Sequence, residues 1–378
     1  MAGLQLQLRH KTAPHIAMAA TTAAAAPQDS AHAPALTFPR PIFAAVAPHP
    51  FLQAHLAASQ PSKTPLRANS RTAHDFRRVG INTGSLTHCN GSAVVRLGNT
   101  SAVCGVRAEI LHEAHVQGTA DFAPSTGNEA EEDPEREREE IESLRLLVPN
   151  VELSTGSTPQ HIPGNAPSSF AQTLITRVQS LLLSTSLVRL SDLRILYTPP
   201  SNLDDPDVEP VPQLKGYWVL YIDIFYISID GNAFDAAWVA ILAALKNSVI
   251  PHAFWDEDLE TILCSDVPSE AHPLTLRGLP IPSTFAVFEG KRDWNETGEE
   301  EEADWVLSDP DAFEESVCRE SVCVVVDCTG GNKGTKDGIL KRLEKSGGGV
   351  VERDAMKGLV KRAVDRWAEV EKATNAKS

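Results

Sequence analysis

YWVLYIDIFYISI-DGN-AFDAAWVAILAALK, residues 217–246, decides the fold of this 378-residue chain. Residues 217–229 are almost all β-branched, aromatic or aliphatic, which predicts a buried strand. Asp230-Gly231-Asn232 is a turn signal. Residues 233–246 are so rich in Ala, Leu, Ile and Val that the helix they predict must be buried on most sides. The stretch therefore predicts a strand that leads directly into a core helix.

The chain on both sides of this stretch repeats strands followed by helices. Alternating apolar and polar residues, separated by Asn-Gly and Gly-Asn turns, predict a hairpin over 92–109. Helical spacing of apolar residues predicts a helix over 170–185, which Ser168 or Ser169 caps. Strands at 283–288 and 322–326 and an amphipathic helix over 353–372 follow. This order predicts an α+β fold with a first half over 51–250 and a second half over 251–372.

The first 50 residues are rich in Ala, Pro and His and contain a single acidic residue. Such a composition suits an organelle transit peptide, but Arg and Ser are sparse and prolines interrupt any amphipathic helix. We therefore predict a disordered extension over 1–50. Ordered structure is expected from a short helix at about Phe51.

Two acidic blocks, 129–142 and 299–302, interrupt the pattern. Blocks of like charge repel one another and stay solvated, so both are predicted to be surface loops. An acidic segment that mimics nucleic acid is the alternative for the first block.

The formal net charge of −16 makes the chain a poor candidate for binding nucleic acid unaided, because phosphate contacts need clustered Lys and Arg. The cysteines form no Cys-x-x-Cys pair, so we expect buried reduced thiols, no metal and no cofactor. Reduced cysteines indicate a cytosolic or nuclear compartment. No stretch approaches the roughly 20 apolar residues of a membrane span.

The sequence matches none of the familiar catalytic motifs. Residues 330–336, GGNKGTK, lack the Gly-Lys-Ser/Thr order of a phosphate-binding loop. Asp230 and Asp235 could form a carboxylate pair, but a turn residue and a favourable charge at a helix N-terminus explain them better. Neither a Gly-x-Ser-x-Gly elbow nor a metal-ligand spacing of His residues is present.

Several separated segments together resemble RNase PH-like proteins. They are residues 90–109, residues 218–237, residues 279–288, and Ser308-Asp309-Pro310 followed by Glu314-Glu315. The resemblance covers about 51–372 and is specific because the segments occur in order. It implies the RNase PH-like (ribosomal protein S5 domain 2-like) fold, in which two βαβ-type halves surround a shared core.

Within this family, the Asp230-Gly231-Asn232-Ala233 turn is similar to the inactive ring subunits of the eukaryotic RNA exosome. Residues 148–151 and 243–247 are most similar to the subunit type called OIP-two in animals, here in a fungal counterpart. The resemblance implies a six-membered ring with other RNase PH-like subunits, cap proteins with RNA-binding domains, an associated exonuclease and RNA as partners, and a place in the nucleus, nucleolus and cytoplasm.

The resemblance also implies a dismantled active site. Phosphorolysis needs cations that hold phosphate and a carboxylate that assists transfer. Arg177 remains on the helix 170–185, but Leu181 and Ser184 stand where active relatives carry arginines. Asn232 replaces part of a phosphate-binding turn, and Ser283 replaces an aspartate. Asp309 aligns with another family aspartate.

Two sets of cations are candidates for RNA contact. Arg177 either touches RNA or pairs across a subunit interface. The basic stretch 63–78 either contacts RNA or is solvated surface; its candidates are Lys63, Arg67, Arg71, Arg77 and Arg78.

The sequence thus predicts a non-catalytic subunit of the exosome ring that supports 3′–5′ RNA processing and degradation. The alternative is a phosphorolytic 3′–5′ exoribonuclease that acts alone or shares a site with a partner. A weaker third possibility is an acidic scaffold unrelated to RNA.

Overall fold

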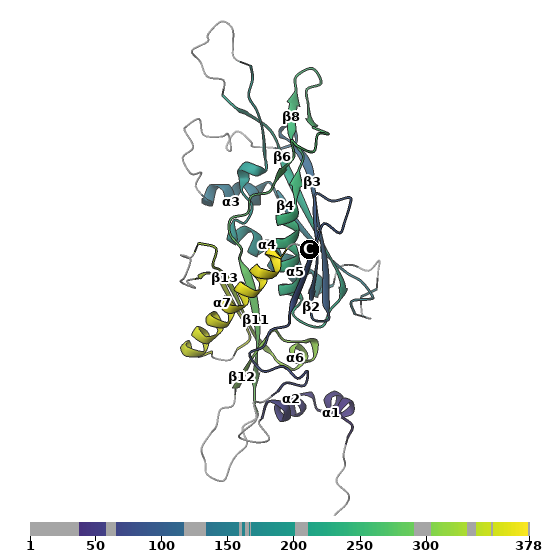
Figure 1. Ribbon diagram of the computed structural model, residues 1–378, viewed down its shortest axis with the longest axis vertical. Helices are drawn as coiled ribbons and strands as arrows, with labels where there is room; N and C mark the ends of the chain where they lie inside the picture. The colour runs from purple at the N-terminus through teal and green to yellow at the C-terminus, as the bar shows by residue number, and fades with distance from the viewer. Residues whose placement is uncertain are drawn as a thin grey trace, which may run out of the picture.

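Two β-sheets and the helices between them form the protein, seen in a computed structural model (Figure 1). The structure describes residues 38–57, 66–116, 134–158, 161–162, 166, 168–200, 211–290, 304–330, 338–348 and 351–376. The first sheet has the order β1-β2-β3-β6-β4, and β5 also pairs with β6. Its strands are β1 (Val79–Thr83), β2 (Gly91–Leu97), β3 (Thr100–His112), β4 (Leu147–Leu153), β5 (Arg194–Tyr197) and β6 (Gln213–Ser228).

The second sheet has the order β12-β11-β13-β14 and is antiparallel throughout. Its strands are β11 (Ile281–Glu289), β12 (Asp304–Ser308), β13 (Glu320–Asp327) and β14 (Ile339–Ser346). Two short ladders complete the strands, β7 (Val249–Ile250) with β10 (His272–Pro273), and β8 (Ala253–Asp256) with β9 (Thr261–Cys264).

Strand β6 is the central strand of the first sheet, as its composition predicts. It pairs antiparallel with β3 over nearly its whole length and parallel with β4. Ile222, Ile224 and Tyr226 alternate on the covered face and are buried, whereas Phe225 and Ile227 point the other way and are exposed. The period of two therefore leaves part of one sheet face open.

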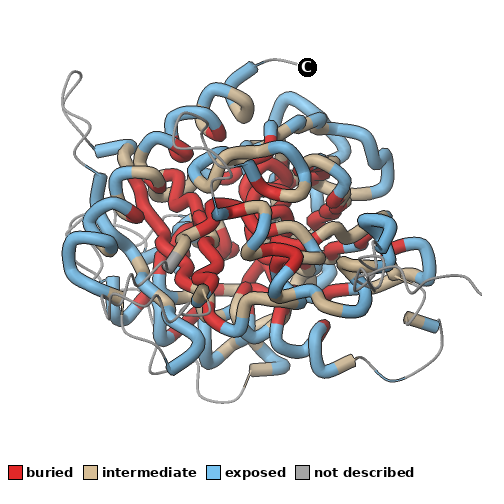
Figure 2. Tube along the Cα trace, turned by 90° about the horizontal axis from the view of Figure 1, so that it is seen from below, coloured by how far each residue is buried: buried red, intermediate tan, exposed pale blue. Residues whose placement is uncertain are grey.

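Helix α5 (Ala233–Asn247) joins the two sheets into one core. Its residues from 233 to 245 are all buried, and the Trp238 indole donates a hydrogen bond to the Pro280 carbonyl at 2.7 Å. Gly91 permits this packing, because a Cβ there would lie 2.5 Å from the carbonyl oxygen of Ala244. One hydrophobic cluster contains residues of both sheets, which Figure 2 shows as a continuous buried interior.

Each half contains a βαβ-type connection. The chain runs from β4 through α4 (Ser169–Thr185) to the parallel strand β6. Strands β12 and β13 are both antiparallel to β11 and hence parallel to each other, with α6 (Ala312–Val317) between them. Helix α7 (Arg353–Asn375) packs on this second sheet through Leu359, Ala363 and Trp367. Ser168 caps α4 as predicted, since it accepts a hydrogen bond from Ala171 N at 3.2 Å.

The prediction of a disordered extension is wrong for residues 40–50; residues 1–37 lie outside the described part. Helices α1 (Arg40–Val46) and α2 (Pro48–Leu56) occupy this segment. Proline stands in the first turn of each helix, where its missing N–H costs nothing, so the prolines begin these helices. Helix α2 is held by Leu52 and Leu56, which pack against Phe288 in a second, smaller cluster.

The prediction of a solvated acidic loop is also wrong for 134–142, which belongs to α3 (Pro134–Ser143). Glu140 is fully buried and pairs with Arg194 at 2.6 Å, and the Tyr217 hydroxyl donates to it at 2.8 Å. Glu137 pairs with Arg277. Interior cations thus hold two of the acidic side chains, which composition alone does not reveal. Residues 129–133 and 299–302 lie outside the described part.

The cysteines are free thiols, and Cys104 and Cys323 are buried as predicted. Burial raises the pKa of the Cys323 thiol to about 12. Cys264 is exposed at the end of β9, so the expectation of burial is wrong there. In the described part of the chain, no helix is both long and apolar enough to cross a bilayer.

The Glu140–Arg194 pair gives a stability test. Glu140→Ala should lower the free energy of unfolding by about 3 kcal/mol, because it leaves a buried guanidinium without its carboxylate. Urea unfolding measures the change. The matched control is Glu139→Ala on the exposed face of the same helix, which should change stability by less than about 0.5 kcal/mol. Equal effects of the two substitutions would contradict the anchoring of α3.

Candidate functional site

A hollow of about 240 Å³ lies at the N-terminus of α5, where the two halves meet. We call it the α5 hollow. Helix α4 contributes Phe170, Leu174 and Arg177 to its wall, and the remaining lining comes from the start of α5, from β11 and from the segment around α6 and β13. Those residues are Asn232, Ala233, Phe234, Thr284, Ala286, Pro310, Glu315, Cys318, Arg319, Glu320 and Ser321.

The turn between β6 and α5 shapes the floor of this hollow. Gly231 and Asn232 both have positive φ, 70° and 50°, and a Cβ on Gly231 would lie 2.4 Å from the backbone of Asp311. The Asn232 side-chain amide donates to Asp309 at 2.7 Å and to Asp235 at 2.9 Å. The start of α5 is thus surrounded by carboxylates.

Glu315 occupies the position where a helix N-terminus would hold an anion. Its Oε1 accepts a hydrogen bond from the backbone N–H of Asn232 at 2.7 Å. Although much of the Glu315 side chain is exposed, desolvation of the carboxyl raises its pKa to about 7. Free N–H groups and the helix dipole make such a terminus an anion site, and here a carboxylate of the chain itself uses one of them.

Asp235 is buried in the first turn of α5 and bound to β11. It accepts hydrogen bonds from Thr284 N at 2.9 Å and from Thr284 Oγ1 at 2.7 Å. Burial raises the pKa of its carboxyl, although these hydrogen bonds oppose the shift. Asp230 has different partners, including Asn99 Nδ2 at 3.0 Å. The structure therefore agrees with the structural interpretation of both aspartates.

Asp309 lies behind the turn in a buried ion pair with Arg77. Arg77 donates to it from Nε at 2.8 Å, from Nη2 at 2.7 Å and from the backbone N at 2.8 Å. Burial alone would raise the pKa of this carboxyl, but the hydrogen bonds and charge of Arg77 outweigh burial and hold the pKa below its ordinary value. Asp309 is fully buried, so it serves the scaffold and does not face the hollow.

The predicted RNA contacts at Arg67 and Arg77 are wrong, because both side chains are buried. Arg67 donates to the Ser308 carbonyl at 2.5 Å and pairs with Glu314 at 3.2 Å. Arg71 is partly buried and donates to the Asp309 carbonyl at 3.0 Å. Arg78 is exposed, and its RNA contact stays a prediction. Lys63 lies outside the described residues.

Arg177 pairs within the chain. Its guanidinium donates to Glu344 of β14 at 2.8 and 3.0 Å and lies 3.9 Å from the ring centroid of Phe234. The side chain is 31% exposed, so it borders the α5 hollow while two groups hold it.

Of the other positions predicted to mark a degenerate site, only Asn232 lines the α5 hollow. Leu181 is fully buried in the core, and Ser184 is exposed and donates to the Leu181 carbonyl. They lie roughly 6 and 10 Å farther along the helix axis than Arg177, at 1.5 Å per residue. Ser283 is fully buried; its neighbour Thr284 faces the hollow because strand residues alternate. Leu181, Ser184 and Ser283 therefore do not line the α5 hollow, and their assignment to a degenerate site stays a prediction.

Sequence reasoning missed Phe234, Thr284 and Arg319, and did not assign Glu315 a role. One sequence motif could have predicted the position of Glu315. Asp311-x-x-Glu314 is a capping box, and the structure contains both of its hydrogen bonds. It predicts a helix that starts at residue 312 and therefore carries Glu315 in its first turn.

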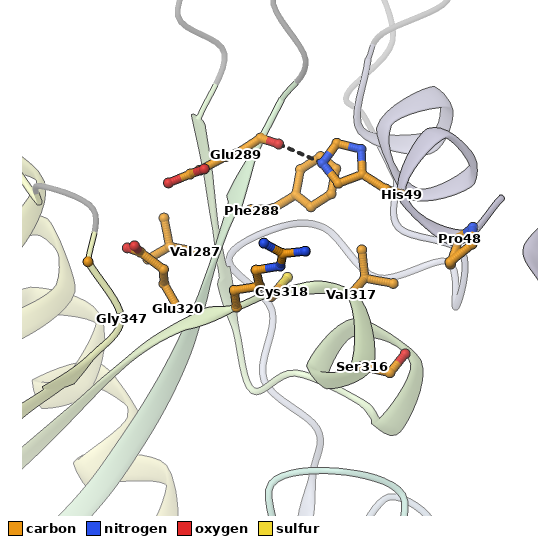
Figure 3. A pocket seen from close by; sticks show the side chains of 12 residues that line it. Pro48, His49, Val287, Phe288, Glu289, Ser316, Val317, Cys318, Glu320 and Gly347 are labelled. Carbon is orange, nitrogen blue, oxygen red and sulfur yellow. Dashed lines mark hydrogen bonds between the residues drawn. The ribbon is translucent and has the colours of Figure 1, made fainter.

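A larger hollow of about 860 Å³ lies on the other side of the α6–β13 turn (Figure 3). We call it the α2 hollow, because Pro48 and His49 of α2 form one wall. His49 Nε2 bonds to the Glu289 carbonyl at 2.9 Å. Desolvation raises the pKa of the Cys318 thiol at its base to about 12, so this thiol is no nucleophile at neutral pH. Residues 318–320 border both hollows.

Comparisons with known proteins agree with this architecture. A model of the 3′ exoribonuclease family, domain 1, matches residues 75–251. The exosome complex component rrp43 of Schizosaccharomyces pombe is 31% identical over 267 residues, which are 71% of this chain and 81% of that protein. Exosome complex component Rrp42 of Methanothermobacter thermautotrophicus is 25% identical over 300 residues, 79% of this chain and 86% of that protein.

Solved structures share the fold. A chain of the Archaeoglobus fulgidus exosome with RNA bound to the active site aligns with a TM-score of 0.56 at 21% identity, over 86% of this chain and 96% of that one. A chain of an archaeal exosome core aligns with a TM-score of 0.50 at 20% identity, over 82% and 92%. The predicted α+β fold is confirmed.

The Arg77–Asp309 pair predicts a specific pH dependence. The lowered pKa of Asp309 means that its stabilising contribution is complete above the ordinary value of about 4 and fades as the pH falls below it. Asp309→Asn should cost about 3 kcal/mol near neutral pH. The difference in free energy of unfolding between wild type and variant should be constant above about pH 5 and should shrink as the pH falls from there to about pH 3, measured by urea unfolding. Asp354→Asn, at an exposed position on α7, is the control, and a pH-independent difference for Asp309→Asn would contradict the pair.

The raised pKa of Glu315 predicts a pH dependence of stability opposite to that of Asp309. A raised pKa means that the folded state holds the proton more tightly, so this group lowers stability as the pH rises from its ordinary 4.5 to about 7. Glu315→Gln keeps an oxygen acceptor for Asn232 N–H but cannot ionise. The variant should therefore gain stability relative to wild type over that interval, as followed by thermal unfolding. Glu139→Gln should show no such trend, and parallel pH curves for Glu315→Gln and wild type would refute the shift.

Proposed function

Because the chain belongs to the 3′ exoribonuclease (RNase PH) family, we propose that it is a non-catalytic ring subunit of an RNA exosome. The relatives named above are exosome components, and the fold aligns with an exosome chain over most of its length. The open face of β6 carries exposed Phe225 and Ile227. Apolar side chains on an uncovered sheet face suit a protein that neighbouring subunits cover.

The Glu315–Asn232 hydrogen bond is the observation that carries the non-catalytic proposal. Phosphorolysis would bring an inorganic phosphate to a site of cations and free N–H groups. At the start of α5, the backbone N–H of Asn232 instead binds a carboxylate of the chain. Asp235 and Asp309 both accept hydrogen bonds from the Asn232 side chain. A phosphate placed there would have to displace Glu315, because this carboxylate already accepts the hydrogen bond of that N–H.

One of the two arginines that line the hollow is also engaged. Arg177 would have to leave Glu344 and the Phe234 ring to bind phosphate. A volume of about 240 Å³ lies below the range of roughly 300–1,000 Å³ in which small-molecule ligands are usually held. Both facts support a site that does not bind and turn over a nucleotide.

The rival proposal is a phosphorolytic site shared with a neighbouring subunit. Arg319 favours it, since this side chain is exposed at the border of both hollows and could reach a partner's site. The acidic surroundings of Asn232 count against this chain as the half that holds phosphate.

In the proposed role, the subunit supports 3′–5′ RNA processing and degradation, including rRNA maturation and mRNA turnover, and lines the RNA channel of the ring. Its partners would be other RNase PH-like subunits, cap proteins with RNA-binding domains, the associated exonuclease and RNA. We propose the nucleus, nucleolus and cytoplasm as its locations, consistent with the free thiols.

The test uses the full chain with a 5′-labelled single-stranded RNA and inorganic phosphate. We expect no phosphate-dependent shortening by the chain alone, with an active RNase PH-family enzyme as the positive control. Co-expression with other RNase PH-like subunits should give a complex that elutes as one species in size-exclusion chromatography. In that complex, Arg177→Ala should leave the shortening rate within about twofold of wild type, since an interaction absent from the transition state does not affect the rate.

Two results would contradict the proposal in different ways. Phosphate-dependent shortening by the isolated chain that Arg177→Ala abolishes would show an active enzyme. A complex whose activity requires Arg319, tested as Arg319→Ala beside Arg353→Ala as the exposed control, would show the shared site.

A further inference from the structure

The β8–β9 hairpin and the segment after it form an acidic and apolar surface at one end of the molecule. The hairpin projects at the end opposite helices α1 and α2 (Figure 1). Residues 253–270 contain six acidic residues and neither Lys nor Arg. Three large apolar side chains are exposed among them, Phe254 at 40%, Leu259 at 64% and Val267 at 48%. We call residues 253–270 the acidic hairpin.

One face of the hairpin packs against the rest of the protein. Trp255 and Ile262 are cross-strand partners, and Ile262 is buried close to Gly216 of β6. Lys215 lies 4.8 Å from the Trp255 ring centroid. Phe254 and Leu263 form the next pair and, by alternation, occupy the other face. The packed face holds the strands in place and leaves the Phe254 face to solvent.

The turn presents Leu259 in a defined position. Asp256 Oδ1 accepts hydrogen bonds from Asp258 N at 2.9 Å and from Leu259 N at 3.0 Å. Both backbone groups of the turn are therefore tied to one carboxylate. A turn whose backbone is held in this way needs little further ordering on binding, which favours the use of Leu259 as an anchor.

We propose that the acidic hairpin docks a protein surface in which Lys and Arg surround an apolar recess. The carboxylates of the hairpin attract such a surface, and Leu259 and Phe254 fill its recess, in the pattern of an apolar centre with a charged rim. RNA does not fit, because its phosphates would meet six carboxylates without a cation from this segment. The inference goes beyond ring membership and does not depend on the loss of catalysis.

The experiment measures binding of a fluorescein-labelled amphipathic Lys/Leu peptide to the full chain by fluorescence anisotropy at physiological salt. The first variant carries Asp258→Lys, Glu260→Lys and Asp266→Lys together and keeps Asp256, whose carboxylate holds the turn. It should weaken binding about tenfold or more, because it reverses the local field. The matched control carries Glu352→Lys, Asp354→Lys and Glu369→Lys, which change the net charge equally at exposed positions at and on α7, and should stay within about twofold.

A second pair of variants tests the apolar anchor at constant charge. Leu259→Ser should weaken peptide binding about fivefold or more, as expected for the loss of a buried anchor. Leu340→Ser on β14, which removes another exposed leucine, should have no effect. Thermal unfolding confirms that all variants fold.

Three results would overturn the proposal. The peptide fails to bind the wild-type chain, or the control triple variant weakens binding as much as the hairpin variant, so that binding follows net charge alone. The third is binding of a labelled single-stranded RNA that Leu259→Ser abolishes, which would make nucleic acid the occupant.

Discussion

The buried pair between Arg77 and Asp309 is the interaction on which the candidate site depends. Besides its three hydrogen bonds to Asp309, Arg77 donates to the Asp230 carbonyl at 2.6 Å. One guanidinium thus ties the segment before β1, the segment after β12 and the turn before α5 to one another. Asn232 in this turn adopts a left-handed conformation, which asparagine tolerates better than most residues other than glycine.

The chemistry of the α5 hollow follows from that turn. Its geometry points the Asn232 amide at Asp235 and Asp309 and its backbone N–H at Glu315. At the N-cap of α5, one backbone N–H is thereby occupied by a carboxylate of the chain itself and is not free for an external anion.

The extent to which the sequence predicts this structure differs between the fold and the site. Strand β6 and helix α5 are readable because burial imposes their composition over a long stretch. The N-terminal helices and α3 cannot be predicted in this way. Helix α3 depends on Arg194 and Tyr217, which lie far from Glu140 in the sequence. The candidate site is difficult to predict from the sequence for the same reason. Arg77 looks like a surface cation in a basic stretch, and only the fold brings Asp309 to it.

The distribution of charge predicts that this chain alone would bind RNA weakly. Many arginines form ion pairs with carboxylates of the same chain, namely Arg67, Arg71, Arg77, Arg177, Arg194 and Arg277. A guanidinium held in this way releases no counterions from a nucleic acid. With 50 acidic against 34 basic side chains, the remaining surface repels phosphate. Within the proposed ring, affinity for RNA would therefore come mainly from the neighbouring subunits, while this chain contributes shape, interfaces and a field that keeps the strand from settling on it.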